Sequence, residues 1–298
     1  MNYIILDLEW NGSYSKSERK FINEIIEFGA VKVDNDFNII DTFSTLIIPQ
    51  IGKKICNRVS ELTKITNDEL KDNGITFQQA SEMFTEFSSD CVIMTWGNSD
   101  IHALIDNYVY YYNDYHVPFL KKYCDIQKYC EKSMGIYNAS QQIGLSTCAE
   151  ELKVDFSEEE HHRATADAVL SLKCVKKLID KYPIQDYIED TDNDDFYHRI
   201  KFKAHFITDL NSPEIDKSQL EFNCKLCGGT AKRTSKWKSR NKGFSANFEC
   251  NDCKRAFIGR VYFKKKYDGI QVNKKVYYKP EPDENTDCES KGNKTGDN

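Results

Sequence analysis

Four apolar runs in the N-terminal part of the chain have the length and composition of β-strands. They are rich in Ile, Val, Leu and Phe, and they cover residues 3–10, 25–33, 41–49 and 91–96. Helical patterns fill the intervals, first over residues 65–87 with a break at Asn73-Gly74, and then over residues 99–112. A later stretch, residues 164–182, carries apolar residues at helical spacing and ends before Pro183. This order predicts an α/β fold built in layers around one sheet.

The composition changes after Pro183, which we take as a domain boundary. Residues 184–222 are polar and acidic and predict a partly ordered connector, whereas residues 280–298 have almost no apolar side chains and predict a disordered tail. We therefore expect a first domain over residues 1–183 and a second, small one over residues 223–279.

The net charge of the 298 residues, −6, conceals a strong asymmetry. Residues 224–279 contain 16 Lys or Arg and 3 acids, a net charge of +13, whereas residues 1–223 carry −15. A basic module attached to an acidic body indicates a polyanionic partner, and the alternative is a contribution to solubility alone. The chain starts directly with a strand pattern and has no signal peptide or apolar span, and its 11 cysteines are an odd number. These features favour a cytoplasmic protein without a disulfide framework.

Two acids, Asp7 and Glu9, lie within the first apolar run "YIILDLEWN". Side chains two apart on a strand share a face, so these carboxylates project together while Leu6, Leu8 and Trp10 project to the other side. At about 4 Å, and with an effective dielectric constant of about 20, two such charges repel by roughly 4 kcal/mol. The pair therefore needs protonation, a basic partner or a cation, unless it lies in solvent at the end of the strand.

Two later segments add residues of the same chemistry. Asp100, in "WGNSDIHAL", starts a helix just after an apolar strand, and "HHRATADA" contains His162 and Asp167. On one regular helix a separation of five residues would turn the last two side chains about 140° apart. They can meet only if His162 precedes the helix, in a loop that bends back. Each residue alone has a commoner reading, as a helix-start acid or a surface histidine.

Together, "DLE" at 7–9, "WGNSD" at 96–100 and "HRATADA" at 162–168 resemble the DEDDh family of 3′-to-5′ exonucleases, within the ribonuclease H-like superfamily. Two further segments fit, "IIEFGAVKVD" at 25–34 and "SELTKITNDEL" at 60–70, and the resemblance spans roughly residues 1–182. It is greatest to the RNA-processing branch typified by the enhancer-of-RNAi enzymes. One departure is Ala166, where many relatives carry an acid that is not a metal ligand.

The resemblance implies a ribonuclease H-like mixed sheet flanked by helices, and it implies a site. Asp7, Glu9, Asp100 and Asp167 would hold two Mg²⁺ or Mn²⁺ ions, and His162 would take a proton from the attacking water. The products would be nucleoside 5′-monophosphates, released from a free single-stranded 3′ end, and resemblance to the RNA-processing branch favours RNA as the substrate. Repair or proofreading of DNA is the alternative, and a non-catalytic nucleic-acid adaptor is another. Three residues are candidates for substrate binding. Leu62 corresponds to the family position that packs against the terminal base, and Trp10 and Trp96 flank the site residues. Core packing is the alternative for Trp96.

The basic module contains a second candidate metal site. Cys224 and Cys227 form one C-x2-C pair, and after 22 residues Cys250 and Cys253 form another. Four thiolates at this spacing predict a closed tetrahedral Zn²⁺ site, and "CKLCGG" resembles the knuckle of a zinc ribbon, so we expect a small β-rich domain stabilised by one structural Zn²⁺. Lys and Arg alternate there with aromatic residues that we expect to stack on bases: Trp237, Phe244, Phe248, Phe257, Tyr262 and Phe263. The alternatives are a purely structural module or one that binds a protein.

Overall fold

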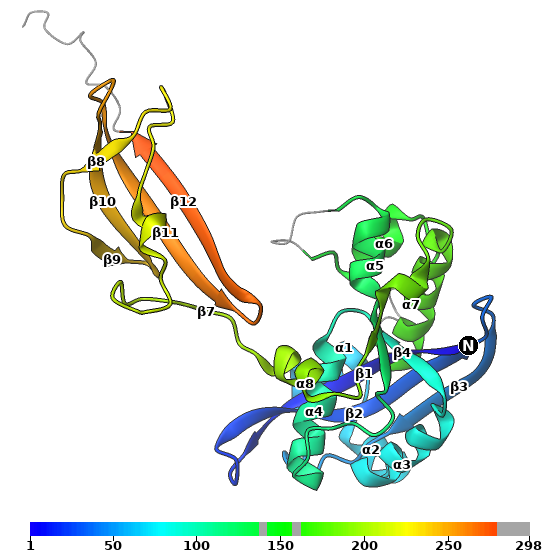
Figure 1. The fold of residues 1–298 in the computed structure, drawn as a ribbon. Coiled ribbons are helices and arrows are strands. Elements are labelled where there is room, and N and C mark those ends of the chain that lie inside the picture. The colour runs from blue at the N-terminus through cyan, green and yellow to red at the C-terminus, as the bar shows by residue number, and fades with distance from the viewer. Residues whose placement is uncertain (137–141, 157–161, 279–298) are drawn as a thin grey trace, which may run out of the picture. The chain divides into compact units, whose positions relative to one another are not determined.

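The structure is a computed structural model that describes residues 1–136, 142–156 and 162–278. The chain divides into two compact units, Met1–Lys201 (unit 1) and Phe202–Asn298 (unit 2), which Figure 1 shows with their elements labelled. No helix in the described ranges is both long and apolar enough to span a bilayer. The tail predicted to be disordered, residues 280–298, lies outside the described residues.

A six-stranded mixed sheet with the order β3-β2-β1-β4-β5-β6 forms the centre of unit 1. Its strands are β1 (Asn2–Ser15), β2 (Lys20–Val33), β3 (Ile39–Leu46), β4 (Cys91–Thr95), β5 (Lys122–Asp125) and β6 (Ile188–Asp190). The first three strands are antiparallel, β4 and β5 run parallel to β1, and β6 returns antiparallel at the edge. This is the mixed sheet that the family resemblance implies.

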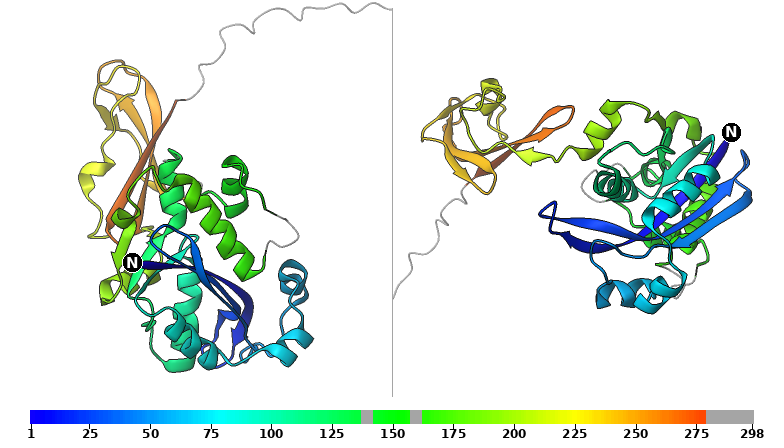
Figure 2. Two further views of the ribbon diagram at one scale, coloured as in Figure 1. Left: turned by 90° about the vertical axis from the view of Figure 1, so that its right-hand side faces the viewer. Right: turned by 90° about the horizontal axis from the view of Figure 1, so that it is seen from below.

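Helices cover both faces of this sheet (Figures 1 and 2). They are α1 (Asn57–Thr63), α2 (Asn67–Asn73), α3 (Phe77–Phe87), α4 (Ser99–Tyr112), α5 (Ile126–Ser133), α6 (Leu145–Glu151), α7 (Ala164–Leu178) and α8 (Asp194–Lys201), with a short 3-10 helix at Ile184–Tyr187. One buried cluster joins α3, α4 and α8 to one face of the sheet, and a second joins α5, α6 and α7 to the other. The expected break between α2 and α3 and the expected helix before Pro183 are confirmed.

The alternation along β1 places the acids of the first motif. Leu6 and Leu8 belong to the cluster with α3 and α4, whereas Tyr3 and Ile5 belong to the cluster with α7. Asp7 and Glu9 continue the second series, so they face the α7 side of the sheet.

Unit 1 extends beyond the boundary that we expected at Pro183. Residues 184–201 are ordered, because β6 adds to the sheet edge and α8 buries Phe196, Tyr197 and Ile200 in the core of unit 1. The remainder of the expected connector belongs to unit 2, where Ile207, Ile215 and Phe222 are buried. The acidic segment "EDTDNDD" indicated a connector because the buried apolar residues on either side of it are widely spaced in the sequence.

Unit 2 is a β-sheet that packs on one side only. Its elements are β7 (His205–Phe206), a 3-10 helix at Lys217–Leu220, β8 (Ala231–Arg233), β9 (Lys238–Arg240), β10 (Gly243–Cys250), β11 (Ala256–Lys266) and β12 (Gly269–Tyr278). The antiparallel path is β12-β11-β10-β8, with β7 added to β11 and β9 to β10. Residues 207–222 supply the apolar side chains that cover one face.

The position of the core corrects one expectation about the aromatic residues. Phe244, Phe248, Phe257 and Phe263 are at most 2% exposed and form the core of unit 2, so they cannot stack on bases. Trp237 packs against the same core. Only Tyr262 of the expected set lies on the other side of the sheet, because it alternates with Val261 and Phe263 along β11.

Candidate active site and metal centres

Three carboxylates from two elements converge on the α7 side of the sheet. Asp7 and Glu9 lie on β1, and Asp167 lies in the first turn of α7. One oxygen atom from each carboxylate can be chosen so that all three lie within 4.8 Å of one another. The strand and the helix therefore bring together residues that are 160 positions apart in the sequence.

Gly29 allows α7 to approach the sheet closely enough for this arrangement. It pairs with Asp7 across β1 and β2, and a Cβ atom at this position would lie 2.1 Å from the backbone nitrogen of Thr165. Such a contact is far shorter than van der Waals packing allows, so only glycine fits here. The same pair of strands contains a β-bulge between Glu9 and Trp10, and bulges commonly re-aim side chains beside active sites.

His162 lies two residues before α7, as its separation from Asp167 predicts. The helix starts at Ala164, and His162 has a positive φ of 72°, which turns the chain back. Its backbone N–H donates a hydrogen bond to Oδ2 of Asp167 at 3.2 Å. This bond holds the loop that carries His162 against the Asp167 carboxylate. The acidic run at residues 158–160, which we expected to permit this loop, lies outside the described residues.

An ion pair between Arg163 and the buried Glu27 fixes the start of α7, and sequence reasoning missed it. Nε and an NH2 nitrogen of Arg163 donate to Oε1 of Glu27 at 3.1 and 2.7 Å, and the Ala164 N–H donates to Oε2 at 3.1 Å. Glu27 is 1% exposed and pairs with Glu9 across the strands. The signal was present in the sequence, because Glu27 interrupts the apolar run "IIEFGAV" as Asp7 interrupts "YIILDLE". A bidentate pair of this kind holds the segment that carries His162 and Asp167.

Asp100 lies next to the three-carboxylate group but is not part of it. It is buried in the first turn of α4, directly after β4, as predicted. Its Oδ1 accepts a hydrogen bond at 3.0 Å from the backbone N–H of Leu8, the residue between Asp7 and Glu9. This bond orients the Asp100 carboxylate against β1.

The acids raise one another's proton affinity. Burial, followed by the charges of Asp100, Asp167 and Glu9, raises the pKa of Asp7 well above its ordinary value. Burial and the charge of Asp167 raise the pKa of Glu9 to about 8, and burial raises the pKa of Asp100 to about 7. Arg163 is the cation that acts on Glu9 in the opposite direction. Without a further cation, the site therefore holds protons near neutral pH.

This donor set suits hard divalent cations. Carboxylate oxygens are the preferred ligands of Mg²⁺ and Mn²⁺, and a cation among the acids would offset the burial and the mutual repulsion that raise their pKa values. Asp7, Glu9 and Asp167 would hold such ions directly, with Asp100 beside them. Such an ion, when bound, would supply Lewis-acid chemistry at this place, and the three carboxylates would hold it there.

The candidate substrate-binding residues differ in their surroundings. Leu62, on α1, is 49% exposed and available for contact. Trp10 packs against the cluster on the other side of the sheet from Asp7, and Trp96 packs against the α7-side cluster with its indole N–H donated to the Ile143 carbonyl at 3.2 Å. Both indoles therefore contribute to packing.

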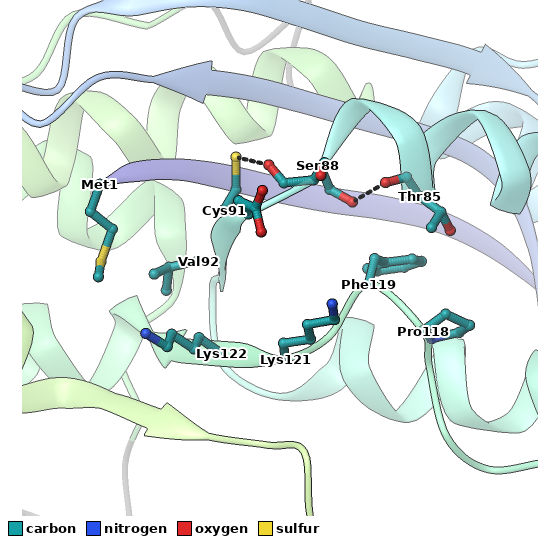
Figure 3. Close-up of a pocket in the computed structure, with 11 residues that line it drawn as sticks. Met1, Thr85, Ser88, Cys91, Val92, Pro118, Phe119, Lys121 and Lys122 are labelled. Atoms are coloured by element: carbon teal, nitrogen blue, oxygen red, sulfur yellow. Dashed lines mark hydrogen bonds between the residues drawn. The ribbon is translucent and has the colours of Figure 1, made fainter.

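A separate pocket of about 230 Å³ lies at the edge of the sheet where the parallel strands β1, β4 and β5 begin. Cys91 and Val92 at the start of β4 line it together with Lys121 and Lys122 (Figure 3). The carboxylates lie toward the other end of the strands, so this pocket is not part of the candidate active site.

Four cysteines form the second candidate metal centre, in unit 2. The Sγ atoms of Cys224, Cys227, Cys250 and Cys253 all lie within 4.8 Å of one another, with Cys224 and Cys253 3.7 Å apart and Cys227 and Cys250 3.4 Å apart. Four sulfurs about 2.3 Å from one tetrahedral ion would be roughly 3.8 Å apart. The hydroxyl of Tyr278 contacts Cys224 Sγ at 3.3 Å, and this hydrogen bond is the largest cause that lowers the pKa of Cys224 to about 6. The hydrogen bond from Tyr278 thus favours the thiolate form of Cys224, the form that binds a metal.

Comparison with known proteins gives the class of protein that this site defines. Residues 4–175 match the exonuclease family model RNase_T. A curated relative, the probable 3′-5′ exonuclease KapD of Bacillus subtilis strain 168, is 30% identical over 178 residues, which cover 58% of this chain and 82% of KapD. A second, the PolC-type DNA polymerase III of Mycoplasma genitalium, is 28% identical over 168 residues, which cover 55% of this chain and only 10% of the polymerase.

Solved structures share the fold of unit 1. The nuclease domain of 3′hExo, a DEDDh family member crystallised with rAMP, matches with a TM-score of 0.51 and 22% identity over 60% of this chain and 92% of that one. A full-length 3′-exonuclease matches equally well, with a TM-score of 0.51 and 22% identity over 60% of each chain.

The chain belongs to the exonuclease family whose model it matches. The predicted fold class and enzyme class, a ribonuclease H-like α/β protein and a 3′-to-5′ exonuclease, are confirmed.

Proposed function

We propose that this protein is a DEDDh exonuclease that uses two Mg²⁺ or Mn²⁺ ions to hydrolyse single-stranded RNA from its 3′ end to nucleoside 5′-monophosphates. The observation that carries the proposal is the convergence of Asp7, Glu9 and Asp167 within 4.8 Å, with Asp100 beside them and His162 tied to Asp167. In this role the acids hold the cations, and the His162 ring accepts a proton from the attacking water. Leu62 packs against the terminal base.

RNA is proposed over DNA because the motif segments of this chain resemble the RNA-processing branch most. This branch is typified by the enhancer-of-RNAi enzymes, and a DNA exonuclease of the repair or proofreading type is the alternative. We further propose that the cysteine cluster of unit 2 binds one structural Zn²⁺ and that unit 2 is a zinc ribbon. All ten described cysteines are free, which supports a reducing compartment such as the cytoplasm.

The test uses 5′-labelled single-stranded RNA, single-stranded DNA and duplexes of one sequence, each with Mg²⁺ or Mn²⁺. We expect a ladder shortened from the 3′ end, fastest on single-stranded RNA. Asp7→Asn and His162→Ala should lower the rate at least a hundredfold. Asp72→Asn and His198→Ala, which make the same chemical changes at exposed positions, are the matched controls. Equal activity of Asp7→Asn and wild type would reject the site, and binding without cleavage under both metals would favour a non-catalytic adaptor.

A further inference from the structure

The sheet of unit 2 has one face that its own core leaves uncovered. Phe257, Val261 and Phe263 of β11 point into the core beneath residues 207–222. The alternate residues of β11, Arg260, Tyr262 and Lys264, therefore point to the other side. We call this second side of β7 to β12 the open sheet face.

Strand register defines what the open sheet face carries. Arg260 pairs with Ser245 of β10 and Lys275 of β12, and Lys264 pairs with Gln271 of β12 and Phe206 of β7. Paired residues share a face, so the pairs extend the surface to β8 and β9 as well. Its cationic strand residues are Lys232, Lys238, Arg240, Arg260, Lys264, Lys266 and Lys275. Among the described residues, the strands add one acid to this face, Glu249, which lies opposite Lys232.

Aromatic rings lie among these cations. The ring of Tyr262 covers Gly243, where a Cβ atom would come within 2.7 Å of it. The Arg260 guanidinium lies 5.2 Å from the Tyr262 ring centroid, and Phe206 lies 6.3 Å from Tyr262 in an edge-to-face arrangement. Lys264 is 5.8 Å from the Phe206 ring. Tyr277, 46% exposed, adds a third ring on β12.

This combination fits a single nucleic-acid strand better than a protein. Interfaces between proteins have cores depleted of charge, whereas cations are distributed over this whole face with almost no compensating acid. Phosphates satisfy such cations, and unstacked bases can lie on exposed rings regardless of sequence. A duplex would offer its phosphates but would keep its bases stacked away from the rings.

We propose that the open sheet face binds single-stranded nucleic acid, with Arg260 and Lys264 contacting phosphates and Tyr262 stacking on a base. The proposal rests on the proposed function for the identity of the strand as substrate. It assigns the binding to the strands of the sheet and not to the two cysteine loops, residues 224–227 and 250–254, which carry the four cysteines. It also replaces the buried phenylalanines, which the sequence indicated as stacking residues, by Tyr262 and its neighbours.

The test measures the affinity of full-length, zinc-loaded protein for a 5′-fluorescein 20-nucleotide single strand by anisotropy, without added Mg²⁺ or Mn²⁺. Arg260→Gln/Lys264→Gln should raise Kd at least tenfold and lower the slope of log Kd against log salt by about 1.4, because each phosphate contact contributes about 0.7. Tyr262→Leu keeps an apolar side chain but loses stacking, so it should raise Kd about 5- to 100-fold with the salt slope unchanged. Lys225→Gln/Lys254→Gln removes the same charge from the cysteine loops and should leave Kd within twofold of wild type. Zinc content and circular dichroism confirm that each variant is folded.

Three results would overturn the inference. They are wild-type affinity in the open-face double variant, wild-type affinity in Tyr262→Leu, and a loss in the cysteine-loop variant as large as that in the open-face variant. A polyglutamate peptide that displaced the oligonucleotide as well as unlabelled RNA does would assign the face to acidic proteins instead. Because binding is measured without cleavage, a protein that binds through this face but never cleaves would reject the proposed function alone. If the protein cleaves RNA but substitutions on the open sheet face leave its affinity unchanged, only this inference would be rejected.

Discussion

Replacing Glu9 by Gln should stabilise the metal-free protein at alkaline pH while it abolishes activity. Burial and the charge of Asp167 raise the pKa of Glu9 from 4.5 to about 8 in the folded state. Between these pH values the folded protein binds more protons than the unfolded chain, so its free energy of unfolding falls as the pH rises toward 8. Glutamine occupies the same volume without a charge, and it removes the contribution of Glu9 to this fall.

The expected magnitude follows from the shift. A difference of one in pKa corresponds to about 1.4 kcal/mol, so the whole shift of Glu9 corresponds to about 5 kcal/mol at pH 8. Part of the shift comes from the charges of Asp167, Glu27 and Asp100, which can take up protons in place of Glu9, so we expect roughly 2 to 3 kcal/mol for the single substitution. At pH 4.5 both proteins are largely neutral at this position, and the difference should approach zero.

Urea unfolding in buffer without Mg²⁺ or Mn²⁺ measures this difference. Trp10 and Trp96 report on unit 1 when Trp237 of unit 2 is replaced by Phe. Glu86→Gln, the same change on the exposed side of α3, is the control and should have no pH-dependent effect. Mg²⁺ should raise the free energy of unfolding of the wild type more at pH 8 than at pH 4.5. It should raise the free energy of unfolding of Glu9→Gln by less than that of the wild type. A Glu9→Gln protein that is no more stable than wild type at pH 8 would refute the reasoning.

The remaining predictions concern the supports of the two metal centres. Gly29→Ala places a Cβ atom 2.1 Å from a backbone nitrogen of α7, so cleavage should fall about a hundredfold; wild-type kinetics would contradict the close approach. Arg163→Met should destabilise unit 1 by about 3 kcal/mol in urea unfolding because it leaves the buried Glu27 carboxylate unpaired, and adding Glu27→Gln should recover part of that loss; no recovery would argue against the pair. Cys227→Ser should release the metal and unfold unit 2, measured by zinc content and Trp237 fluorescence, without shifting the unfolding of unit 1; an intact unit 2 without zinc would show that the core suffices.

The strands and the helix that carry the site were predictable because strong local signals mark them. The apolar runs define the parts of β1, β2 and β4 that lie in the core, and the spacing of His162 and Asp167 requires the loop before α7. The outer parts of β1 and β2, by contrast, continue as a hairpin through polar residues 11–24. That pairing is set by the partner strand and leaves no apolar run to detect.

Tertiary packing decided what the sequence left open. Glu27 carries the same signal as Asp7, an acid in an apolar strand, but only the fold shows that Glu27 pairs with Arg163 whereas Asp7 lies among the acids Asp100, Asp167 and Glu9. In unit 2 the alternation of aromatic and basic residues along β11 is evident, whereas the face that residues 207–222 cover is not. Because the phenylalanines lie on the covered face, we assign the stacking role to Tyr262 on the open sheet face.

The direction and product of cleavage test the central claim most directly. A single-stranded RNA labelled at its 3′-terminal nucleotide is incubated with the protein and Mg²⁺, and the first labelled product is separated by chromatography. We predict a labelled nucleoside 5′-monophosphate at the earliest time points, and none with Asp167→Asn. Release of longer labelled fragments first, or the same product from Asp167→Asn, would contradict the site described here.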